Sequence, residues 1–428
     1  MNVALAYGKT GLNITLPAGF DYRLLEARSA VALPDGPAAI AAALDAPVGT
    51  PALADLARGK RTAAISVCDI TRPAPNRLVL PPLLDRLEQG GISRENVTIL
   101  IATGLHRPAT DDEIREIVGP SLYGTLRVVN HNAKVLAEHR YLGDTSTGTP
   151  VHIDERFLAA DLHITLGFIE PHLMLGFSGG RKLIAPGLAA QETIKVLHSP
   201  KFMRDPRAVE GSVAGNPLHR ELLEIARIAR HDFLVDVSLS RDRKIAQVFA
   251  GHPEQAHRNG MEFVGRTLLE PLDAPVDAVI TTAAGYPLDL TFYQTVKGIT
   301  AASHIVKPGG RILVISECPE GAGAPEFRDM LKAFPTPDSF LDHIAHNPQV
   351  VVDQWQLEKL ALVSRGRQIF YYVPGLEQRY QNKLWGSTFP NAAEAIAAVL
   401  HGLPPGARVA VIPEGPYVLA KVEEPVLA

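Results

Sequence analysis

The sequence predicts an α/β protein of two domains, each with a parallel or mixed sheet flanked by helices. Three observations support this fold class. The chain has 428 residues, more than one ordinary core holds and enough for two or three domains. Short apolar, β-branched runs alternate along it with amphipathic stretches of helical length. A Pro- and Asp-rich segment, residues 268–277, interrupts the alternation, and a second α/β series follows.

The first series begins with a predicted β-hairpin. Residues 1–17, MNVALAYGKTGLNITLP, alternate apolar and polar side chains around a Gly-containing turn. Thr110 and Glu113 form a capping-box pattern, and Asn216 marks the start of a helix over 216–230. Three apolar runs are the predicted strands of this series: 62–69, 97–103 and 161–170. Strands this apolar, placed between helices, indicate a parallel or mixed sheet covered by helices.

The second series predicts a second domain. Its expected strands and helices are 276–285, 291–303, 309–317, 324–333 and 352–363. We place the boundary near residue 271, which gives an N-terminal cofactor-binding domain of residues 1–270 and a C-terminal domain of residues 271–404. A last strand is predicted within 407–415, and we expect residues 405–428 to return to the first domain. The active site is expected in the interdomain cleft.

Composition favours a small-molecule partner. The net charge is −4 and no run of Lys or Arg forms a basic patch, so neither nucleic acid nor a membrane surface is expected to bind. The two cysteines exclude a disulfide scaffold and fit a reducing compartment. The N-terminus does not resemble a signal peptide, and no window reaches eighteen apolar residues. A soluble, cytoplasmic protein is expected.

Two predicted strands are each followed by reactive side chains. Asp69 and Arg72 lie in CDITRPAP (68–75), and His106 lies in ATGLHRPATDDE (102–113). Sites in α/β sheets gather at such strand ends. An Asp–Arg pair can orient a carboxylate or a nearby histidine, and a histidine can exchange protons at neutral pH. The alternative is an ordinary ion pair that holds a loop, beside a histidine without a catalytic role.

The segment SGGRK is the most informative. Ser178, Gly179 and Gly180 expose backbone N–H groups, while Arg181 and Lys182 add positive charge, as in an anion-binding loop. The pattern is neither a Walker loop nor a Rossmann GxGxxG. A tight turn with solvated charges is the competing interpretation.

Two histidines flank this loop. His172 lies ten residues before Lys182, and His198 lies sixteen residues after it. This spacing matches no familiar zinc pattern, which disfavours a zinc hydrolase. Imidazole suits nickel as well as zinc, so a site with a single His ligand would need a cofactor to supply the remaining ligands.

A fourth segment lies in the second domain. In LDLTFYQTVKGITAA (288–302), helical spacing places Gln294 and Lys297 on one face, with Tyr293 beside Gln294. These groups could bind substrate. A solvent-facing polar stripe is the alternative.

Together these segments resemble the lactate racemase family, the nickel-pincer-nucleotide enzymes. The matching motifs are DITRP, GLHRP, EPHLMLGFSGGRKLIAPG, the later His198 and YQTVK, in order and at similar spacing over most of the chain. The resemblance implies an isomerase, a racemase or epimerase that inverts C2 of a 2-hydroxy acid such as lactate by proton-coupled hydride transfer.

The resemblance also implies a cofactor, pyridinium-3-thioamide-5-thiocarboxylic acid mononucleotide with a carbon–nickel bond. Lys182 would hold it covalently through a thioamide, and His198 would be the metal ligand from the protein. The backbone of Ser178, Gly179 and Gly180 would bind its phosphate. Cofactor-biosynthesis proteins are expected partners.

The remaining site residues have roles implied by the same resemblance. His106 and His172 would flank the substrate as paired acid–base residues. Asp69 and Arg72 would orient the first histidine and the substrate. The substrate-binding group would further include Tyr293, Gln294 and Lys297. Two histidines, one on each face of the substrate, suit an inversion in which either isomer is oxidised to the same keto acid.

Two alternatives remain open at this point. The same chemistry could act on a larger substrate such as malate or a sugar acid, because the catalytic residues would not change. Leu173, Met174 and Leu175 favour an apolar pocket unless they are core residues. An alternative of another class is a non-catalytic protein that binds a nucleotide or the nickel cofactor, which would not need both His106 and His172.

Overall fold

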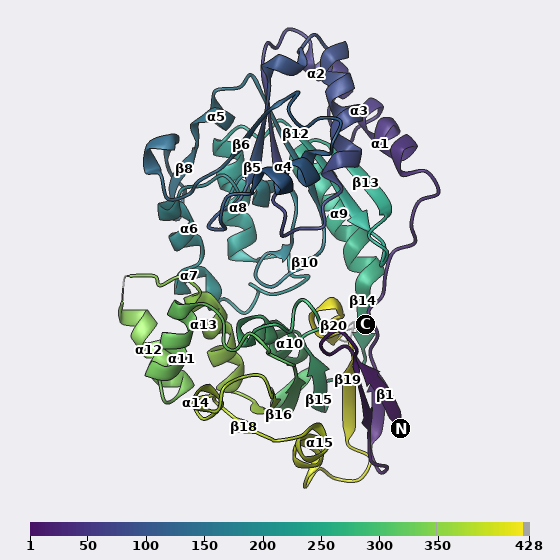
Figure 1. The fold of residues 1–428 in the computed structure, drawn as a ribbon, viewed down its shortest axis with the longest axis vertical. Helices are drawn as coiled ribbons and strands as arrows, with labels where there is room; N and C mark the ends of the chain where they lie inside the picture. Colours follow the sequence, from purple (N-terminus) through teal and green to yellow (C-terminus); the bar gives the residue numbers. More distant parts are fainter. Residues whose placement is uncertain (348, 423–428) are drawn as a thin grey trace, which may run out of the picture. The chain divides into compact units, whose positions relative to one another are not determined.

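The computed structural model describes residues 1–347 and 349–422, and the chain forms two compact units. One unit is Ser29–Thr267; the other combines Met1–Arg28 with the chain from Leu268 onward. Each unit is built on a six-stranded sheet flanked by helices (Figure 1). The predicted fold class, two α/β domains with parallel or mixed sheets, is confirmed.

The unit Ser29–Thr267 contains the predicted first series. Its strands are β4 (Ala63–Cys68), β5 (Val97–Ala102), β6 (Arg127–Asn130), β7 (His139–Asp144), β8 (Pro150–Asp154), β9 (Leu162–Phe168), β10 (Pro171–His172), β11 (Gly176–Phe177), β12 (Phe233–Leu239) and β13 (Ile245–Gly251). Its α-helices are α1 (Gly36–Asp45), α2 (Leu53–Ala57), α3 (Asn76–Gln89), α4 (Asp111–Val118), α5 (Glu155–Leu158), α6 (Gln191–Leu197), α7 (Pro200–Met203), α8 (Pro217–Ile228) and α9 (Pro253–Leu268). Short 3-10 helices are η1 (Arg94–Asn96), η2 (Leu136–Glu138) and η3 (Gly180–Leu183).

The sheet of this unit has the strand order β13-β12-β9-β4-β5-β6. Every pair is parallel except β12 with β13. Strands β4 and β9 are buried along their whole length, because helices and loops cover both sheet faces. Apolar side chains of α1 to α4 share one core with these strands, and α1 lies beside α3 (Figure 1).

Two predicted helix starts are confirmed. Thr110 accepts a hydrogen bond from the N–H of Glu113, whose carboxylate accepts one from the N–H of Thr110, so the capping box is complete. The Asn216 side chain accepts from the N–H groups of Leu218 and His219 and caps α8.

The other unit contains both ends of the chain. Its strands are β1 (Asn2–Leu5), β2 (Leu12–Thr15), β3 (Asp21–Leu24), β14 (Leu269–Leu272), β15 (Val276–Thr282), β16 (Val306–Ile315), β17 (Gln368–Tyr372), β18 (Ser387–Thr388), β19 (Arg408–Ile412) and β20 (Leu419–Val422). Its helices are α10 (Phe292–Ser303), α11 (Pro325–Ala333), α12 (Pro337–His346), α13 (Gln354–Ser364), α14 (Gln378–Gln381), α15 (Ala392–Leu400) and the 3-10 helix η4 (Gly415–Tyr417).

The main sheet of this unit is fully parallel, with the order β18-β17-β16-β15-β19-β3. Successive side chains of its central strands point alternately into two hydrophobic cores, one on each face of the sheet. Val279 points into the core that α10 to α13 cover, whereas Ala278 and Ile280 point into the core beneath α15 and the β1–β2 hairpin. The period of two places successive side chains on opposite sheet faces, so both faces need a cover.

The structure corrects the expected domain limits at the two chain ends. Residues 1–28 were assigned to the N-terminal domain, but β3 pairs with β19 and belongs to the other unit. Residues 405–428 were expected to return to the first domain. Instead β19 pairs with β15 as well as with β3, so its backbone is committed within that other unit. Residues 423–428 lie outside the described part.

The predicted hairpin at residues 1–17 is confirmed, because β1 pairs antiparallel with β2. No helix in the described ranges 1–347 and 349–422 has the length and apolar character needed to cross a membrane.

Candidate active site

The carboxyl ends of three neighbouring parallel strands carry the predicted catalytic groups. β4 lies between β5 and β9, and Asp69, His106 and His172 each follow one of these three strands in the sequence. Parallel strands end at the same sheet edge, so this edge is where an α/β protein places its site. The loop of His106 is tied to the loop after Lys182, because Gly104 N donates to the carbonyl of Gly187 at 3.1 Å.

Asp69 and His106 form a hydrogen-bonded pair. The distance between His106 Nδ1 and Asp69 Oδ2 is 2.7 Å, and Thr71 Oγ1 donates to the other carboxylate oxygen at 2.7 Å. Asp69 is buried, whereas the His106 side chain is half exposed. Burial raises the pKa of Asp69, but the hydrogen bonds from His106 and Thr71 outweigh it and lower the pKa below its ordinary value. The ionised carboxylate therefore fixes the proton of neutral His106 on Nδ1 and leaves a lone pair on Nε2.

Arg72 lies in the same turn and is exposed. Its N–H donates to the carbonyl of Asp69 at 3.2 Å, and its guanidinium donates to the carbonyl of Thr71 at 3.3 Å. Asp69 is hydrogen-bonded to His106, as expected if it orients this histidine and does more than form an ordinary ion pair with Arg72. The guanidinium of Arg72 is exposed at the carboxyl end of the sheet, and its planar set of donors suits a carboxylate or a phosphate.

His172 lies in a small hairpin formed by β10 and β11. The backbone N–H of Met174 donates to His172 Nδ1 at 3.3 Å, so the neutral ring carries its proton on Nε2. Met174 and Leu175 are buried and are core residues rather than an exposed apolar wall. Arg181 holds this hairpin, because its guanidinium donates to the carbonyls of Leu175 and Phe177.

The loop before Lys182 has a conformation that requires glycine. Gly179 has φ +81° and Gly180 has φ +49°. A Cβ on Gly179 would lie 2.4 Å from Asp236 Oδ2. The Gly180 N–H donates to Asp236 at 2.8 Å and the Ser178 N–H donates to the carbonyl of Glu170 at 2.9 Å. Both N–H groups thus have protein acceptors, and the predicted phosphate contact of this loop stays a prediction.

Lys182 and His198 lie close enough to influence each other. Burial lowers the pKa of His198, the hydrogen bond to Ile194 opposes this, and the nearby charge of Lys182 lowers it further. The His198 ring is therefore neutral at neutral pH. Its Nδ1 donates to the carbonyl of Ile194 at 2.8 Å, which places the lone pair on Nε2. A neutral imidazole with its second nitrogen held by a carbonyl is the form that binds a metal.

These two residues fit a cofactor that is anchored on a lysine and coordinated by a histidine. Within the described ranges, no three His, Cys, Asp or Glu side chains come together to hold a metal ion. Any metal at His198 would need further ligands from the cofactor itself.

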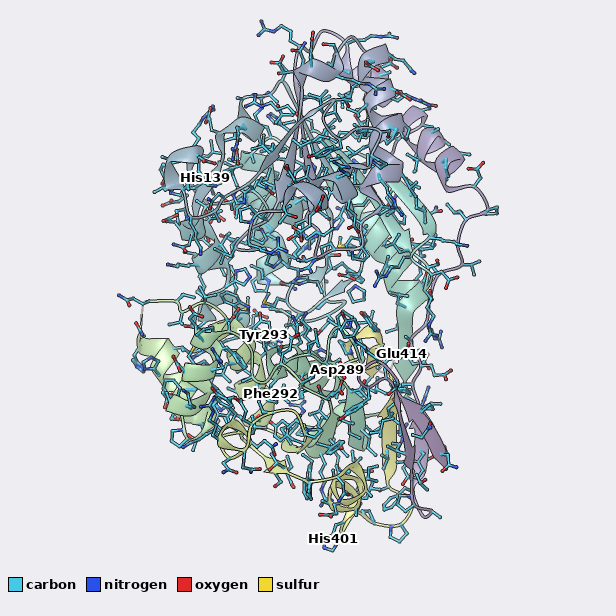
Figure 2. All side chains as sticks on the ribbon, viewed as in Figure 1. His139, Asp289, Phe292, Tyr293, His401 and Glu414 are labelled. Carbon is cyan, nitrogen blue, oxygen red and sulfur yellow. The ribbon has the colours of Figure 1, made fainter. Side chains whose placement is uncertain are left out.

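The predicted substrate-binding residues of α10 lie in the other unit. Figure 2 labels Phe292 and Tyr293, which open this helix, and Asp289 shortly before it. The Tyr293 hydroxyl accepts a hydrogen bond from Trp355 Nε1 at 3.3 Å, so the ring is held in place. Gln294 and Lys297 follow at helical spacing as predicted and are both partly buried. The buried Oε1 of Gln294 has no hydrogen-bond partner within the described residues.

Comparisons with known proteins support the motif-based assignment. The model of the lactate racemase N-terminal domain matches residues 7–211, and that of the lactate racemase C-terminal domain matches residues 272–420. A lactate racemase from Thermoanaerobacterium thermosaccharolyticum is 33% identical over 98% of this chain and 99% of its own. The chain belongs to the lactate racemase family.

Other relatives agree with membership of the lactate racemase family. The lactate racemase of Lactiplantibacillus plantarum is 34% identical over 88% of this chain and 89% of its own length. The solved structure of the T. thermosaccharolyticum lactate racemase apoprotein has a TM-score of 0.91 at 33% identity and covers 99% of this chain and 100% of its own. A crystal structure of a Thermotoga maritima protein has a TM-score of 0.63 at 16% identity, with 87% and 96% coverage, and shares the fold.

Asp236 supports the loop of Lys182 in this member of the lactate racemase family, and no sequence motif indicated it. Its carboxylate is fully buried in β12 and accepts from Gly180 N beneath the loop of Lys182. Burial raises its pKa to about 7, against the opposing effects of the Gly180 N–H and the charge of Arg181. The available signal was a lone Asp inside the apolar strand FLVDVSL, because a carboxyl in such a strand needs a specific partner.

Proposed function

We propose that this chain is a 2-hydroxy acid racemase, an isomerase that inverts C2 of lactate or a related short-chain or hydrophobic 2-hydroxy acid. Membership of the lactate racemase family supports racemase activity. The observation that carries the catalytic proposal is the Asp69–His106 pair at the sheet edge that also bears His172. An imidazole oriented by a buried carboxylate is a general base.

The proposed cofactor is the nickel-pincer nucleotide, covalently held by Lys182 and coordinated by His198. When bound, it would supply the centre that takes hydride from C2 of the substrate and returns it. Partner proteins would have to make this cofactor. The two cysteines are buried and unpaired, which supports a reducing, cytoplasmic setting.

The side chains of this protein would bind the substrate and move its hydroxyl proton. His106 Nε2, with its lone pair, would accept the hydroxyl proton of one isomer. His172 would be the base for the other isomer on the opposite side, which requires the tautomer with the lone pair on Nε2 and the loss of the 3.3 Å hydrogen bond from Met174 N–H to Nδ1. Arg72, Gln294 and Lys297 would bind the carboxylate, and Tyr293 would support Gln294.

A mass measurement on Lys182 tests the class of the protein. In a host that makes the cofactor, the intact protein should carry a nucleotide adduct that Lys182→Ala lacks, and this variant should not racemise lactate. Lys195→Ala, on α6, is the matched control and should keep both adduct and activity. An adduct that persists in Lys182→Ala would disprove the anchor, and a protein that carries the adduct but interconverts no 2-hydroxy acid would support a non-catalytic cofactor carrier.

A second measurement tests the metal ligand. His198→Ala should lose bound nickel while it keeps the covalent nucleotide, because the two attachments are separate. His401→Ala, at an exposed histidine labelled in Figure 2, is the control and should keep its nickel. Full nickel content in His198→Ala would show that another group binds the metal.

A further inference from the structure

A cavity of about 230 Å³ lies within the unit Ser29–Thr267, behind the loop that carries Lys182. The C-terminal part of α8 and the beginning of α9 form its walls. Lys182, His106, His172 and His198 are not among its lining residues, so it is separate from the proposed catalytic groups. Its charged and titratable lining includes Arg181, Arg227, Arg230, His231, Glu254 and His257.

Arg181 supplies a buried positive charge to this cavity. Its side chain is 2% exposed, and its hydrogen bonds go to neutral groups. Nη2 donates to the carbonyls of Leu175 and Phe177 at 3.1 and 3.2 Å, and Nη1 lies 3.3 Å from His257 Nε2 and 3.4 Å from Nδ1. Arg181 Nε is buried and has no hydrogen-bond partner among the described residues. The nearby carboxylate of Asp236 compensates this charge only in part, because burial lowers the pKa of Arg181 to about 9 despite it. A buried guanidinium with an unused donor is therefore costly unless a further anion binds.

The charges around the cavity favour an anion. Three arginines and one glutamate line it, an excess of two positive charges. Glu254 is already paired, because it accepts both guanidinium hydrogen bonds of Arg227 at 2.5 and 2.6 Å. Burial lowers the pKa of His231 to about 3, so this histidine adds no charge at neutral pH.

The two helices affect the cavity unequally. The N-terminus of the 16-residue helix α9 faces it through Pro253 and Glu254, and this end carries the positive part of the helix dipole. The C-terminus of α8 would oppose this effect. Its last carbonyls, however, accept hydrogen bonds from the N–H groups of Ala229, Arg230 and His231, so they are satisfied within the turn.

We propose that this cavity binds a small oxyanion, a phosphate or carboxylate group, between Arg181 and Arg230. The anion would pair the buried guanidinium and accept from its Nε. Arg181 also holds the carbonyls of the hairpin that carries His172, so an occupied cavity would stabilise that hairpin. This site does not depend on the proposed racemase function, because its test is a binding measurement.

Titration of the nickel-free protein tests the site. Inorganic phosphate and, separately, malonate are added at constant ionic strength, with chloride as the reference, while calorimetry and the unfolding temperature are followed. Saturable binding with a rise in Tm is expected. Arg230→Ser should weaken it about threefold to tenfold, because it removes one charge at the exposed rim of the cavity. Arg220→Ser is the matched control, an exposed arginine of α8 outside the cavity, and should bind like the parent.

Further outcomes assign or overturn the site. Binding of phosphate alone supports a phosphorylated ligand, and binding of malonate alone supports a carboxylate. Phosphate could also bind where the cofactor nucleotide is proposed to sit. An effect lost in Arg72→Ser but kept in Arg230→Ser would locate the anion there and overturn the proposal. No saturable binding, or equal weakening in Arg220→Ser and Arg230→Ser, would overturn it as well.

Discussion

The buried carboxylate of Asp69 holds Nδ1 of His106 at 2.7 Å, and this bond determines which nitrogen of His106 faces outward as a base. His172 has the opposite arrangement, because its Nδ1 accepts from the backbone N–H of Met174. In their neutral forms, His106 therefore presents a lone pair on Nε2 and His172 presents an N–H. His106 can therefore accept the hydroxyl proton of a substrate, and neutral His172 can donate a hydrogen bond to the substrate oxygen; His172 becomes a base only in its other tautomer.

The first prediction concerns Asp69. Asp69→Asn keeps the size of the side chain but removes the charge that fixes the His106 tautomer. We expect the racemisation rate to fall about 10²- to 10⁴-fold, with a smaller change in KM. Asp242→Asn, at an exposed turn before β13, is the control and should keep the parent rate. Parent kinetics in Asp69→Asn would mean that the pair holds the loop and has no part in catalysis.

The positions at which the strands before Asp69 and His106 end could be predicted, because local sequence determines where a strand ends. The runs before Asp69 and His106 are apolar and end in Gly- and Pro-rich turns, so both the strands and the position of the reactive groups followed from periodicity. Pairing between distant strands has no such signal. β3 and β19 are short, and the sequence of neither one predicts its partner. They pair in parallel in one sheet, which satisfies backbone hydrogen-bonding groups of both. The local sequence patterns of residues 1–28 and 405–422 do not predict that these two strands pair.

Within the site, the hydrogen-bond partners of single residues were hard to predict for the same reason. The local sequence around Asp69 left open an ordinary ion pair with Arg72 or a role in orienting a histidine, and in the structure Asp69 bonds His106, 37 positions away. The Gly-rich loop of Ser178, Gly179 and Gly180 was expected to expose its backbone N–H groups, and its phosphate-binding role stays a prediction. The structure uses the Gly180 N–H to satisfy Asp236, a buried carboxylate 56 positions away. Both partners come from neighbouring strands and depend on the assembled sheet.

The second prediction concerns stability at low pH. Burial lowers the pKa of His131 and of His219 to about 3, whereas an unfolded histidine titrates near 6.5. Between about pH 3 and pH 6.5, these histidines therefore bind protons in the unfolded chain but not in the folded chain. The stability is fully present above about pH 6.5 and is lost as the pH falls toward 3, by about 1.4 kcal/mol per pH unit for each such histidine.

Chemical denaturation between pH 7 and pH 4.5 measures this slope. His219→Gln removes one titrating group, so the slope should decrease by about one proton relative to the parent. His346→Gln, at an exposed histidine near the end of α12, is the control and should leave the slope unchanged. An unchanged slope in His219→Gln would show that this histidine is protonated in the folded state.

The third prediction concerns Gly298, in the middle of α10. A Cβ at this position would lie 2.1 Å from the carbonyl oxygen of Thr282, at the end of β15. Gly298→Ala must push the helix that carries Gln294 and Lys297 away from its sheet, at a cost of about 1–3 kcal/mol of unfolding free energy. We also expect a higher KM for lactate. Gly366→Ala, where nothing lies within 4 Å of the added Cβ, is the control and should be close to neutral. Unchanged stability and KM in Gly298→Ala would contradict close packing of α10.

The last prediction concerns His106 and His172, and it separates catalysis from binding. If each histidine is the base for one isomer of lactate, removing either one stops racemisation from both directions, because inversion needs both. We expect losses on the order of 10²-fold or more for His106→Ala and for His172→Ala in each direction. Each variant should still oxidise the isomer whose base remains, and only that isomer, in a single turnover. Acid quenching of the loaded enzyme, followed by assay of the 2-keto acid, should therefore give up to one equivalent per site from one isomer and little from the other.

The two variants should show opposite preferences for the isomers. His304→Ala, a histidine at the C-terminal end of α10 outside the proposed site, provides the control and should keep parent rates from both isomers. If His106→Ala and His172→Ala prefer the same isomer, the two rings do not act on opposite faces of the substrate. If either variant racemises at the parent rate, its histidine is a structural residue and the two-base mechanism is wrong. Opposite preferences would also show that His172 reaches the tautomer with its lone pair on Nε2, because its hydrogen bond from Met174 favours the other tautomer.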